Sequence, residues 1–267
     1  EIAKKDLVEC DIDTLGAAGG EDTLGVALKL HKAGAKVVGV PKTIDNDVGG
    51  TEVTFGFDTA LDTATEAIDK LHTTAESHHR VMVLELMGRD AGFIALHSGV
   101  AGGADVILIP EIPFHYDAIV QKILRRVESG RHFSILAVSE GAKPLDGEQI
   151  FSRAGSEVYV PRLGGIGQLV GQYIEQNTEQ ETRVTVLGHI QRGGSPTPYD
   201  RWLATRYGAA ATRLAAAGGF GRMVSLQSGI VTDISLAEAL AVPKRVDVNG
   251  DGVRTARDLG IAFGDEI

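Results

Sequence analysis

The sequence predicts an α/β protein whose mainly parallel β-sheets are covered by helices. Segments with the short apolar pattern of strands alternate with longer segments whose apolar residues recur at helical spacing. Strands that are separated by helices pair in parallel, and such sheets are buried on both faces. Residues 106–109, Val-Ile-Leu-Ile, have the continuous apolar character that such a strand needs. The length of 267 residues allows one large hydrophobic core or two modest lobes.

The first expected elements are two strands, 14–18 and 37–40, with a helix between them. The apolar positions of that helix lie at helical spacing: Leu24, Val26, Ala27 and Leu30. A long helix is expected over residues 57–77, where four apolar residues share one face: Leu61, Ala64, Ile68 and Leu71. Further strands are expected at 81–86, 106–109, 133–138 and 184–187. Further helices are expected at 91–100, 119–127, 166–174 and 199–217.

Composition and charge exclude several classes of partner. The formal net charge of −10 argues against nucleic acid or an anionic membrane as the main partner, because either needs a basic surface. No apolar run approaches the length of a membrane span, and the N-terminus lacks a signal-peptide pattern. Cys10 is the single cysteine, so a disulfide framework is not expected. These features predict a cytoplasmic protein.

The main candidate site is the loop 41–47, Pro-Lys-Thr-Ile-Asp-Asn-Asp, directly behind an apolar strand. Open α/β sheets bind ligands at loops that leave the carboxyl ends of strands. This loop contains two carboxylates, a hydroxyl and an ammonium: Asp45, Asp47, Thr43 and Lys42. Phosphoryl transfer needs a base, carboxylates that hold a divalent metal, and fixed positive charge. The loop predicts that chemistry; the alternative is a polar turn, which Asp and Asn favour for local reasons.

Residues 19–23, Gly-Gly-Glu-Asp-Thr, form a second candidate site between an expected strand and helix. Glycines let backbone amides approach an anion, and a helix N-terminus adds positive partial charge. Glu21 and Asp22 would repel a phosphate directly, so we expect them to act as ligands of a magnesium ion that carries it. The alternative is an N-capped helix with acidic residues in its first turn, which requires no ligand.

The motifs of this chain, taken in order, resemble the 6-phosphofructokinase family. After residues 19–23 and 41–47 come Met87-Gly88-Arg89 and then residues 187–194, Leu-Gly-His-Ile-Gln-Arg-Gly-Gly. The resemblance extends over essentially the whole chain and includes residues 77–80, 109–111 and 139–141. Four ordered motifs are far more specific than a single glycine pair.

The resemblance implies a phosphofructokinase fold of two Rossmann-like lobes. The phosphoryl-donor lobe would comprise residues 1–56 and 192–240, and the sugar-phosphate lobe residues 57–191 and 241–267. Family members carry a phosphate-binding Gly-Gly turn, and a Gly-Thr or Gly-Ser turn with an arginine, before the first motif found here. This chain starts after both, so the donor lobe is expected to be incomplete at its N-terminus. A truncated, inactive chain is therefore one alternative.

The implied reaction transfers a phosphoryl group to the 1-hydroxyl of fructose 6-phosphate and gives fructose 1,6-bisphosphate, a step of glycolysis. The implied catalytic residues are Asp45, Thr43, Asp47 and Arg89. Asp45 would take the proton of the 1-hydroxyl, while Thr43 and Asp47 orient the loop and the metal. Lys42 and Arg89 would stabilise the moving charge, and Glu21 would help to hold Mg²⁺.

For the sugar 6-phosphate the resemblance implies a cluster of three arginines and a histidine: Arg80, Arg183, His189 and Arg192. Guanidinium groups and imidazole suit a dianion through charge-assisted hydrogen bonds. Arg80 and Arg183 match residues that reach in from a neighbouring subunit, which implies a homodimer or homotetramer with shared active sites. Glu140 matches the residue that accepts hydrogen bonds from the sugar hydroxyls, and Met87 and Gly88 would line the same pocket.

The residues implied to bind the phosphoryl donor are Gly20, Asp22, Thr23 and Lys42. In members that use ATP, the residue matching Asp22 is usually glycine, and the one matching Lys42 is often glycine. The Asp22 carboxylate would crowd and repel ATP, whereas Lys42 suits the compact pyrophosphate. We therefore predict pyrophosphate as the donor and a reversible reaction, with an ATP-dependent 6-phosphofructokinase as the alternative.

Residues 247–258 suggest a function of a different class. Asp247, Asn249 and Asp251, with Asp258 at the twelfth position, fit the calcium-loop spacing of EF-hand and dockerin modules. Only one such loop is present, and Asp258 stands where an EF-hand has a bidentate glutamate. A calcium-binding interaction loop on an inactive fragment is therefore a further alternative.

Overall fold

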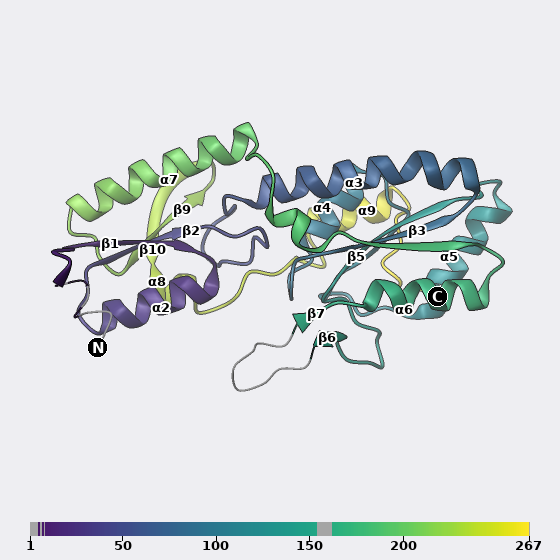
Figure 1. Cartoon of the computed structure of the whole chain (residues 1–267), viewed down its shortest axis with the longest axis horizontal. Coiled ribbons are helices and arrows are strands. Elements are labelled where there is room, and N and C mark those ends of the chain that lie inside the picture. The colour runs from purple at the N-terminus through teal and green to yellow at the C-terminus, as the bar shows by residue number, and fades with distance from the viewer. Residues whose placement is uncertain (1–4, 6, 8, 154–161, 267) are drawn as a thin grey trace. The chain divides into compact units, whose positions relative to one another are not determined.

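A computed structural model of the chain describes residues 5, 7, 9–153 and 162–266. The chain divides into two compact units, each made of two segments of sequence (Figure 1). Unit 1 comprises Glu1–Asp58 and Pro196–Lys244, and unit 2 comprises Thr59–Ser195 and Arg245–Ile267. The sequence predicts lobe boundaries at residues 56/57, 191/192 and 240/241, and the units divide at 58/59, 195/196 and 244/245.

The sheet of unit 1 has four strands in the order β1-β2-β9-β10. Strands β1 (Leu15–Gly19), β2 (Val37–Pro41) and β9 (Arg222–Gln227) run parallel, and β10 (Ile230–Ser235) is antiparallel to β9. Helices α2 (Glu21–Lys32) and α7 (Pro198–Ala216) cover opposite faces of this sheet, and the short α8 (Leu236–Ala239) follows β10 (Figure 1).

Alternation along β9 explains why unit 1 has a core on each face of its sheet. Met223 packs with residues of β2 and α2, such as Leu24 and Val37. Its neighbour Val224 points to the opposite face and packs with Leu203 and Tyr207 of α7. Both helices are therefore held by apolar contacts with the same strands.

The sheet of unit 2 is entirely parallel and has the order β4-β5-β3-β8. Its strands are β3 (Val81–Leu86), β4 (Val106–Leu108), β5 (Ser134–Ser139) and β8 (Thr182–Val186). The helices are α3 (Phe57–His78), α4 (Phe93–Ala101), α5 (Tyr116–Glu128), α6 (Ile166–Asn177) and α9 (Asp251–Asp258), with the 3₁₀ helix η1 at Gly188–Arg192. A separate antiparallel pair joins β6 (Phe151–Arg153) to β7 (Arg162–Leu163).

The predicted α/β class with mainly parallel sheets is confirmed, and each expected strand and helix has a counterpart. The ends differ by a few residues: the helix expected at 119–127 is α5, Tyr116–Glu128, and the strand expected at 184–187 is β8, Thr182–Val186. The prediction omitted β9, β10 and α8, so the antiparallel edge of unit 1 is a correction. The segment 142–163 falls partly outside the described residues.

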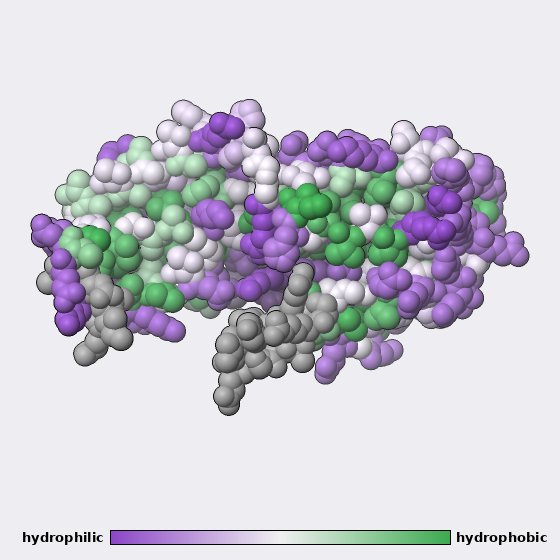
Figure 2. Space-filling model, viewed as in Figure 1, coloured by the Kyte–Doolittle hydropathy of each residue, from purple (hydrophilic) through white to green (hydrophobic). Residues whose placement is uncertain are grey.

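The surface is mixed in polarity. On the face shown in Figure 2, apolar and hydrophilic residues alternate in small groups over both units. None of the described helices combines the length and the apolar character that a membrane crossing requires.

Candidate active site

The two candidate loops of unit 1 are neighbours at the carboxyl edge of its sheet. Strands β1 and β2 are paired in parallel with Gly19 opposite Pro41, so both loops leave the same edge. The Lys42 amide donates to the Gly19 carbonyl oxygen at 3.0 Å. A Cβ atom at Gly20 would lie 3.3 Å from Cβ of Thr43, so the glycine corner lies against the second loop.

The turn at residues 19–23 is called the donor corner below, and most of it is exposed to solvent. Glu21, Asp22 and Thr23 are exposed in the first turn of α2, whose N-cap residue is Gly20 without a side-chain cap. A Cβ atom at Gly19 would lie 2.4 Å from Cβ of Thr23, so the corner requires glycine at that position. Carboxylates near a helix N-terminus are favourable without any ligand, so the structural alternative for Glu21 and Asp22 still applies.

The loop that follows β2 is held close to the protein. Asp45 is 5% exposed, and its backbone amide donates to Oγ1 of Thr43 at 3.2 Å. The same hydroxyl donates to Oδ2 of Asp45 at 3.4 Å. Lys42 is exposed beside the donor corner. The hydroxyl of Thr43 therefore contacts both the backbone and the carboxylate of the proposed base.

Lys244 contacts this loop, although no sequence motif pointed to it. Its amide donates to the Asp47 carbonyl oxygen at 2.8 Å, and its Nζ donates to the Glu52 carbonyl oxygen. Burial lowers the pKa of Lys244 to about 8, although the charges of Glu52 and Asp47 oppose the shift. A lysine held in this way adds positive charge beside the carboxylates of the loop.

In unit 2 the proposed sugar-binding residues follow the carboxyl ends of three adjacent strands. Met87 and Gly88 follow β3, Glu140 follows β5, and η1, which contains His189 and Arg192, follows β8. Parallel strands bring their carboxyl ends to one edge, so these five residues lie on the same side of the sheet.

The loops after β3 and β5 are in direct contact. The Arg89 amide donates to Oε1 of Glu140 at 3.3 Å, and Gly88 has a φ of +144°, which favours glycine. A Cβ atom at Gly141 would lie 1.8 Å from the Arg89 carbonyl oxygen, so any other residue there would push the loops apart. Two expected site residues from distant parts of the sequence, Arg89 and Glu140, are therefore in direct contact.

Arg80 and Arg183 lie at the opposite end of this sheet. Arg80 directly precedes β3, and Arg183 is the second residue of β8, opposite Met82. Both arginines form ion pairs with Glu181; Arg80 Nε lies 2.7 Å from Oε2 of Glu181. The hydrogen bond from Arg80, foremost among several causes, lowers the pKa of Glu181.

The separation follows from strand geometry. A six-residue strand such as β3 spans about 20 Å. Within one chain, Arg80 and Arg183 therefore lie close to each other. Both are far from Glu140, His189 and Arg192. The four members of the expected phosphate cluster do not form one site in a single chain.

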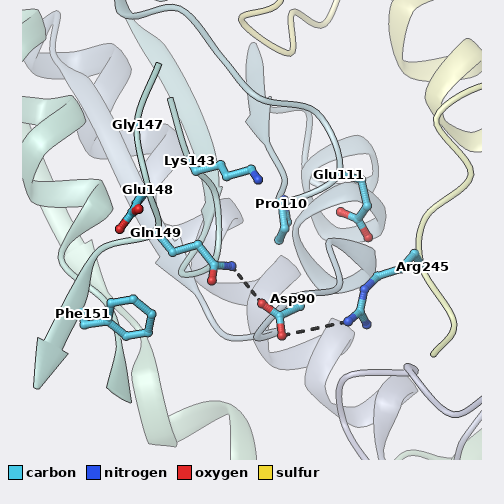
Figure 3. A pocket seen from close by; sticks show the side chains of 9 residues that line it. All are labelled: Asp90, Pro110, Glu111, Lys143, Gly147, Glu148, Gln149, Phe151 and Arg245. Carbon is cyan, nitrogen blue, oxygen red and sulfur yellow. Dashed lines mark hydrogen bonds and ion pairs between the residues drawn. The ribbon is translucent and has the colours of Figure 1, made fainter. Parts of the chain in front are cut away.

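A cavity of about 540 Å³ lies beside the Arg89 and Glu140 loops in unit 2 (Figure 3). Gln149 projects into it and donates to Oδ1 of Asp90 at 2.8 Å and to the Gly141 carbonyl oxygen at 3.1 Å. Asp90 also pairs with Arg245, 3.9 Å away. Sequence reasoning missed Gln149, because it lies in an irregular segment without a motif.

Among the residues that the structure describes, no group of three or more His, Cys, Asp or Glu side chains is arranged to hold a metal ion. Residues Asp251–Asp258 form α9, which places Asp258 about 10 Å along a helix from Asp251. That helix replaces the wrapped loop expected for calcium. Mg²⁺ keeps several waters and needs only one or two carboxylates with substrate phosphates, so the exposed Glu21 fits such an ion.

Comparison with known proteins identifies the family. Residues 1–215 match the family described as Phosphofructokinase. The chain is 57% identical over 267 residues to the ATP-dependent 6-phosphofructokinase of Chloroflexus aurantiacus, covering 99% of this chain and 73% of that protein. It is 53% identical over 247 residues to the pyrophosphate–fructose 6-phosphate 1-phosphotransferase of Amycolatopsis mediterranei, covering 92% and 72%.

Solved structures agree with the fold. The T-state crystal structure of Pichia pastoris phosphofructokinase superposes with a TM-score of 0.79 at 28% identity, covering 98% of this chain and 28% of that one. The pyrophosphate-dependent phosphofructokinase of Nitrosospira multiformis gives a TM-score of 0.81 at 23% identity, covering 97% and 70%, which supports the fold alone. The chain therefore belongs to the phosphofructokinase family.

Proposed function

We propose that the protein transfers a phosphoryl group from pyrophosphate to the 1-hydroxyl of fructose 6-phosphate, as a reversible glycolytic step. The observation that carries the choice of donor is the pair of exposed charged side chains at the donor corner. Asp22 lies in the first turn of α2, and Lys42 is bonded through its amide to Gly19 of the same corner. An aspartate disfavours a bulky polyanion such as ATP, and a lysine attracts the smaller pyrophosphate.

The proposed chemistry is a direct in-line transfer. The carboxylate of Asp45 accepts the proton of the sugar 1-hydroxyl, whose oxygen forms a bond to phosphorus while the bond to the leaving phosphate breaks. Thr43 orients the Asp45 carboxylate through the hydrogen bond described above. Lys42 and Arg89 stabilise the charge that moves onto the leaving group. Mg²⁺, held with the help of Glu21 and oriented with Asp47, would neutralise charge on the donor oxygens.

Binding of the sugar requires residues from more than one chain in this proposal. Glu140, His189 and Arg192 lie at the carboxyl edge of the unit 2 sheet, whereas Arg80 and Arg183 lie at its other end. If all five act on one sugar phosphate, the two arginines come from a neighbouring subunit. We therefore propose a homodimer or homotetramer with shared sites, in which the dianion is held by charge-assisted hydrogen bonds.

ATP is the second candidate donor, because several similar proteins are named as ATP-dependent enzymes. The proteins from Chloroflexus aurantiacus and Clostridium perfringens, 57% and 49% identical to this chain, are both named as ATP-dependent. Relatives from Amycolatopsis mediterranei and Streptomyces coelicolor, 53% and 50% identical, are named as pyrophosphate–fructose 6-phosphate 1-phosphotransferases. Overall sequence identity therefore does not distinguish the two donors. The choice of pyrophosphate depends on the residues of the donor corner.

The experiment compares kcat/KM of the enzyme for magnesium pyrophosphate and for magnesium ATP in one assay. We expect pyrophosphate to be preferred, and a preference for ATP in the unmodified enzyme would overturn the proposal. Asp22→Gly should then raise the use of ATP, because it removes both charge and bulk. Asp22→Asn removes the charge and keeps the size, so it separates the two contributions.

A further inference from the structure

We propose that Thr54 and Asn46 are positioning residues that hold Asp45 in the orientation needed for proton transfer. This inference rests on the proposed function, in which Asp45 is the base. Thr54 lies outside the motifs described above, and Asn46 lies within one without a role of its own. Together they form a clasp, defined here as the hydrogen bonds that connect Thr54 to Thr43 and to Asn46.

The clasp closes the loop on both sides of the proposed base. Oγ1 of Thr54 donates to the Thr43 carbonyl oxygen at 2.9 Å. The Thr54 amide donates to Oδ1 of Asn46 at 3.1 Å. Thr54 is 0% and Asn46 4% exposed, so water does not compete freely for these bonds. The two residues that Thr54 contacts lie on either side of Asp45 in the sequence.

The connection from Thr54 reaches the Asp45 carboxylate in two steps. Thr54 fixes the carbonyl of Thr43, and the hydroxyl of Thr43 contacts both the amide and Oδ2 of Asp45. A shift of the Thr43 backbone would therefore move the hydroxyl that orients the carboxylate. Proton transfer needs heavy atoms within hydrogen-bond reach, so such a shift affects the chemical step directly.

Asparagine suits position 46 for two physical reasons. Its φ is +55°, a left-handed conformation that asparagine tolerates better than most residues. Its side-chain carbonyl reaches the Thr54 amide, which is a buried backbone donor. Glycine meets only the first requirement, so a glycine at this position removes the acceptor and keeps the backbone conformation.

The residues on either side of Thr54 are hydrogen-bonded to α7 within unit 1. The hydroxyl of Tyr207 in α7 donates to the Val53 carbonyl oxygen at 2.7 Å and contacts Oγ1 of Thr51 at 2.9 Å. The Gly56 amide donates to Oδ1 of Asp200, also in α7, at 2.8 Å. Thr54 therefore lies between two anchored positions, and it transmits the position of α7 to the loop that carries Asp45.

The test measures kcat and KM separately in variants of the enzyme. Thr54→Val keeps the shape of the side chain and removes the hydroxyl. We expect kcat to fall on the order of 10- to 100-fold, because a misplacement near 1 Å has effects of this size. The KM for fructose 6-phosphate should stay within about twofold. Thr54→Ser restores the hydroxyl and should recover most of the turnover.

Position 46 provides the second arm of the test. Asn46→Gly keeps the left-handed backbone without the acceptor and should lower kcat. Thr63→Val is the control, because it removes the same kind of bond, from Oγ1 to the Thr59 carbonyl oxygen at 3.0 Å, within α3. Normal kcat in Thr54→Val and Asn46→Gly, or a loss in Thr63→Val as large as theirs, overturns the inference.

A readout without turnover separates this inference from the proposed function. Hydrogen exchange of residues 42–56 should speed up about tenfold in Thr54→Val and Asn46→Gly, because the clasp bonds are lost. Unmodified enzyme that turns over neither donor would refute the proposed function, and the exchange rates would then decide whether the clasp exists. Unchanged exchange in both variants would refute the clasp.

Discussion

For single side chains, the sequence predicted their placement in loops after strands, while their roles in the candidate site stay predictions. Thr43, Asp45 and Glu140 stand in short motifs whose chemistry can be inferred from the sequence. Thr43 and Asp45 lie in the loop that leaves β2, and Glu140 directly follows β5. Tyr207 and Thr54 were not predictable in the same way. Tyr207 is hydrogen-bonded to a residue about 150 positions away, and Thr54 to one about ten positions away. No local sequence pattern predicts such contacts.

Tyr207 gives the molecule a defined response to alkaline pH. Burial raises its pKa from 10.0 to about 12, and its side chain is 0% exposed. A raised pKa means that the contribution to stability is complete below pH 10 and is lost as pH rises towards 12. The free energy of unfolding should fall in that window by up to about 1.4 kcal/mol per pH unit from this group.

The substitution Tyr207→Phe should remove that pH dependence. At pH 8 the variant should be less stable by about 1 kcal/mol, because one hydrogen bond to the Val53 carbonyl is lost while Thr51 still donates to it. The difference should shrink above pH 10, as only the unmodified protein loses this contribution. Urea unfolding at pH 8, 10 and 11 measures the difference; a constant gap would contradict the assignment.

At the scale of elements, the sequence predicted the buried parallel strands well and the antiparallel hairpin not at all. Strands β3 and β5 are buried at every position, so an apolar run alone identifies them. Strand β10 is mostly half-exposed, and its pattern is weaker. The signal that was available is Ser228-Gly229, where both residues have positive φ and connect β9 to β10 as a tight hairpin turn.

Gln149 connects the loops that contain Arg89 and Glu140, and we call this connection a strap. Its amide donates to Asp90, next to Arg89, and to the carbonyl of Gly141, next to Glu140. We predict that Gln149→Ala raises the KM for fructose 6-phosphate about fivefold, since about 1 kcal/mol of support for the Glu140 loop is lost. Steady-state kinetics measures the change, with the exposed Gln168→Ala of α6 as the control. Equal KM values in the two variants would mean that the strap does not position the loop.

At the scale of the whole molecule, the order of motifs predicted the family and the α/β fold. Most of these motifs follow the carboxyl end of a strand, whereas residues 77–80 precede β3. The order did not predict which ends of the unit 2 sheet the motifs occupy. Arg183 and His189 are six positions apart in the sequence, but Arg183 is near the start of β8 and His189 lies beyond its end. That separation underlies the prediction for the assembled enzyme.

If Arg183 acts in the site of a neighbouring subunit, two impaired variants should restore activity when their chains form mixed dimers. Arg183→Ala damages the site of the neighbour, and Arg192→Ala damages the site of its own chain. In a mixed dimer, one site then carries both substitutions and the other carries neither. Random assembly of equal amounts should restore about a quarter of the normal rate, because half of the dimers are mixed and each has one intact site.

The measurement uses fructose 6-phosphate well below the KM of the unmodified enzyme, where loss of a charge-assisted contact of about 1.5 to 3 kcal/mol lowers the rate most clearly. Each variant is assayed alone, and the mixture is assayed after the subunits have been exchanged. If both arginines act within one chain, every site in the mixture is damaged once, and the rate stays at the mean of the two variants. A recovered rate places Arg183 and Arg192 in one site through two different chains, as expected from the position of Arg183 near the start of β8 and of Arg192 in η1, beyond its end.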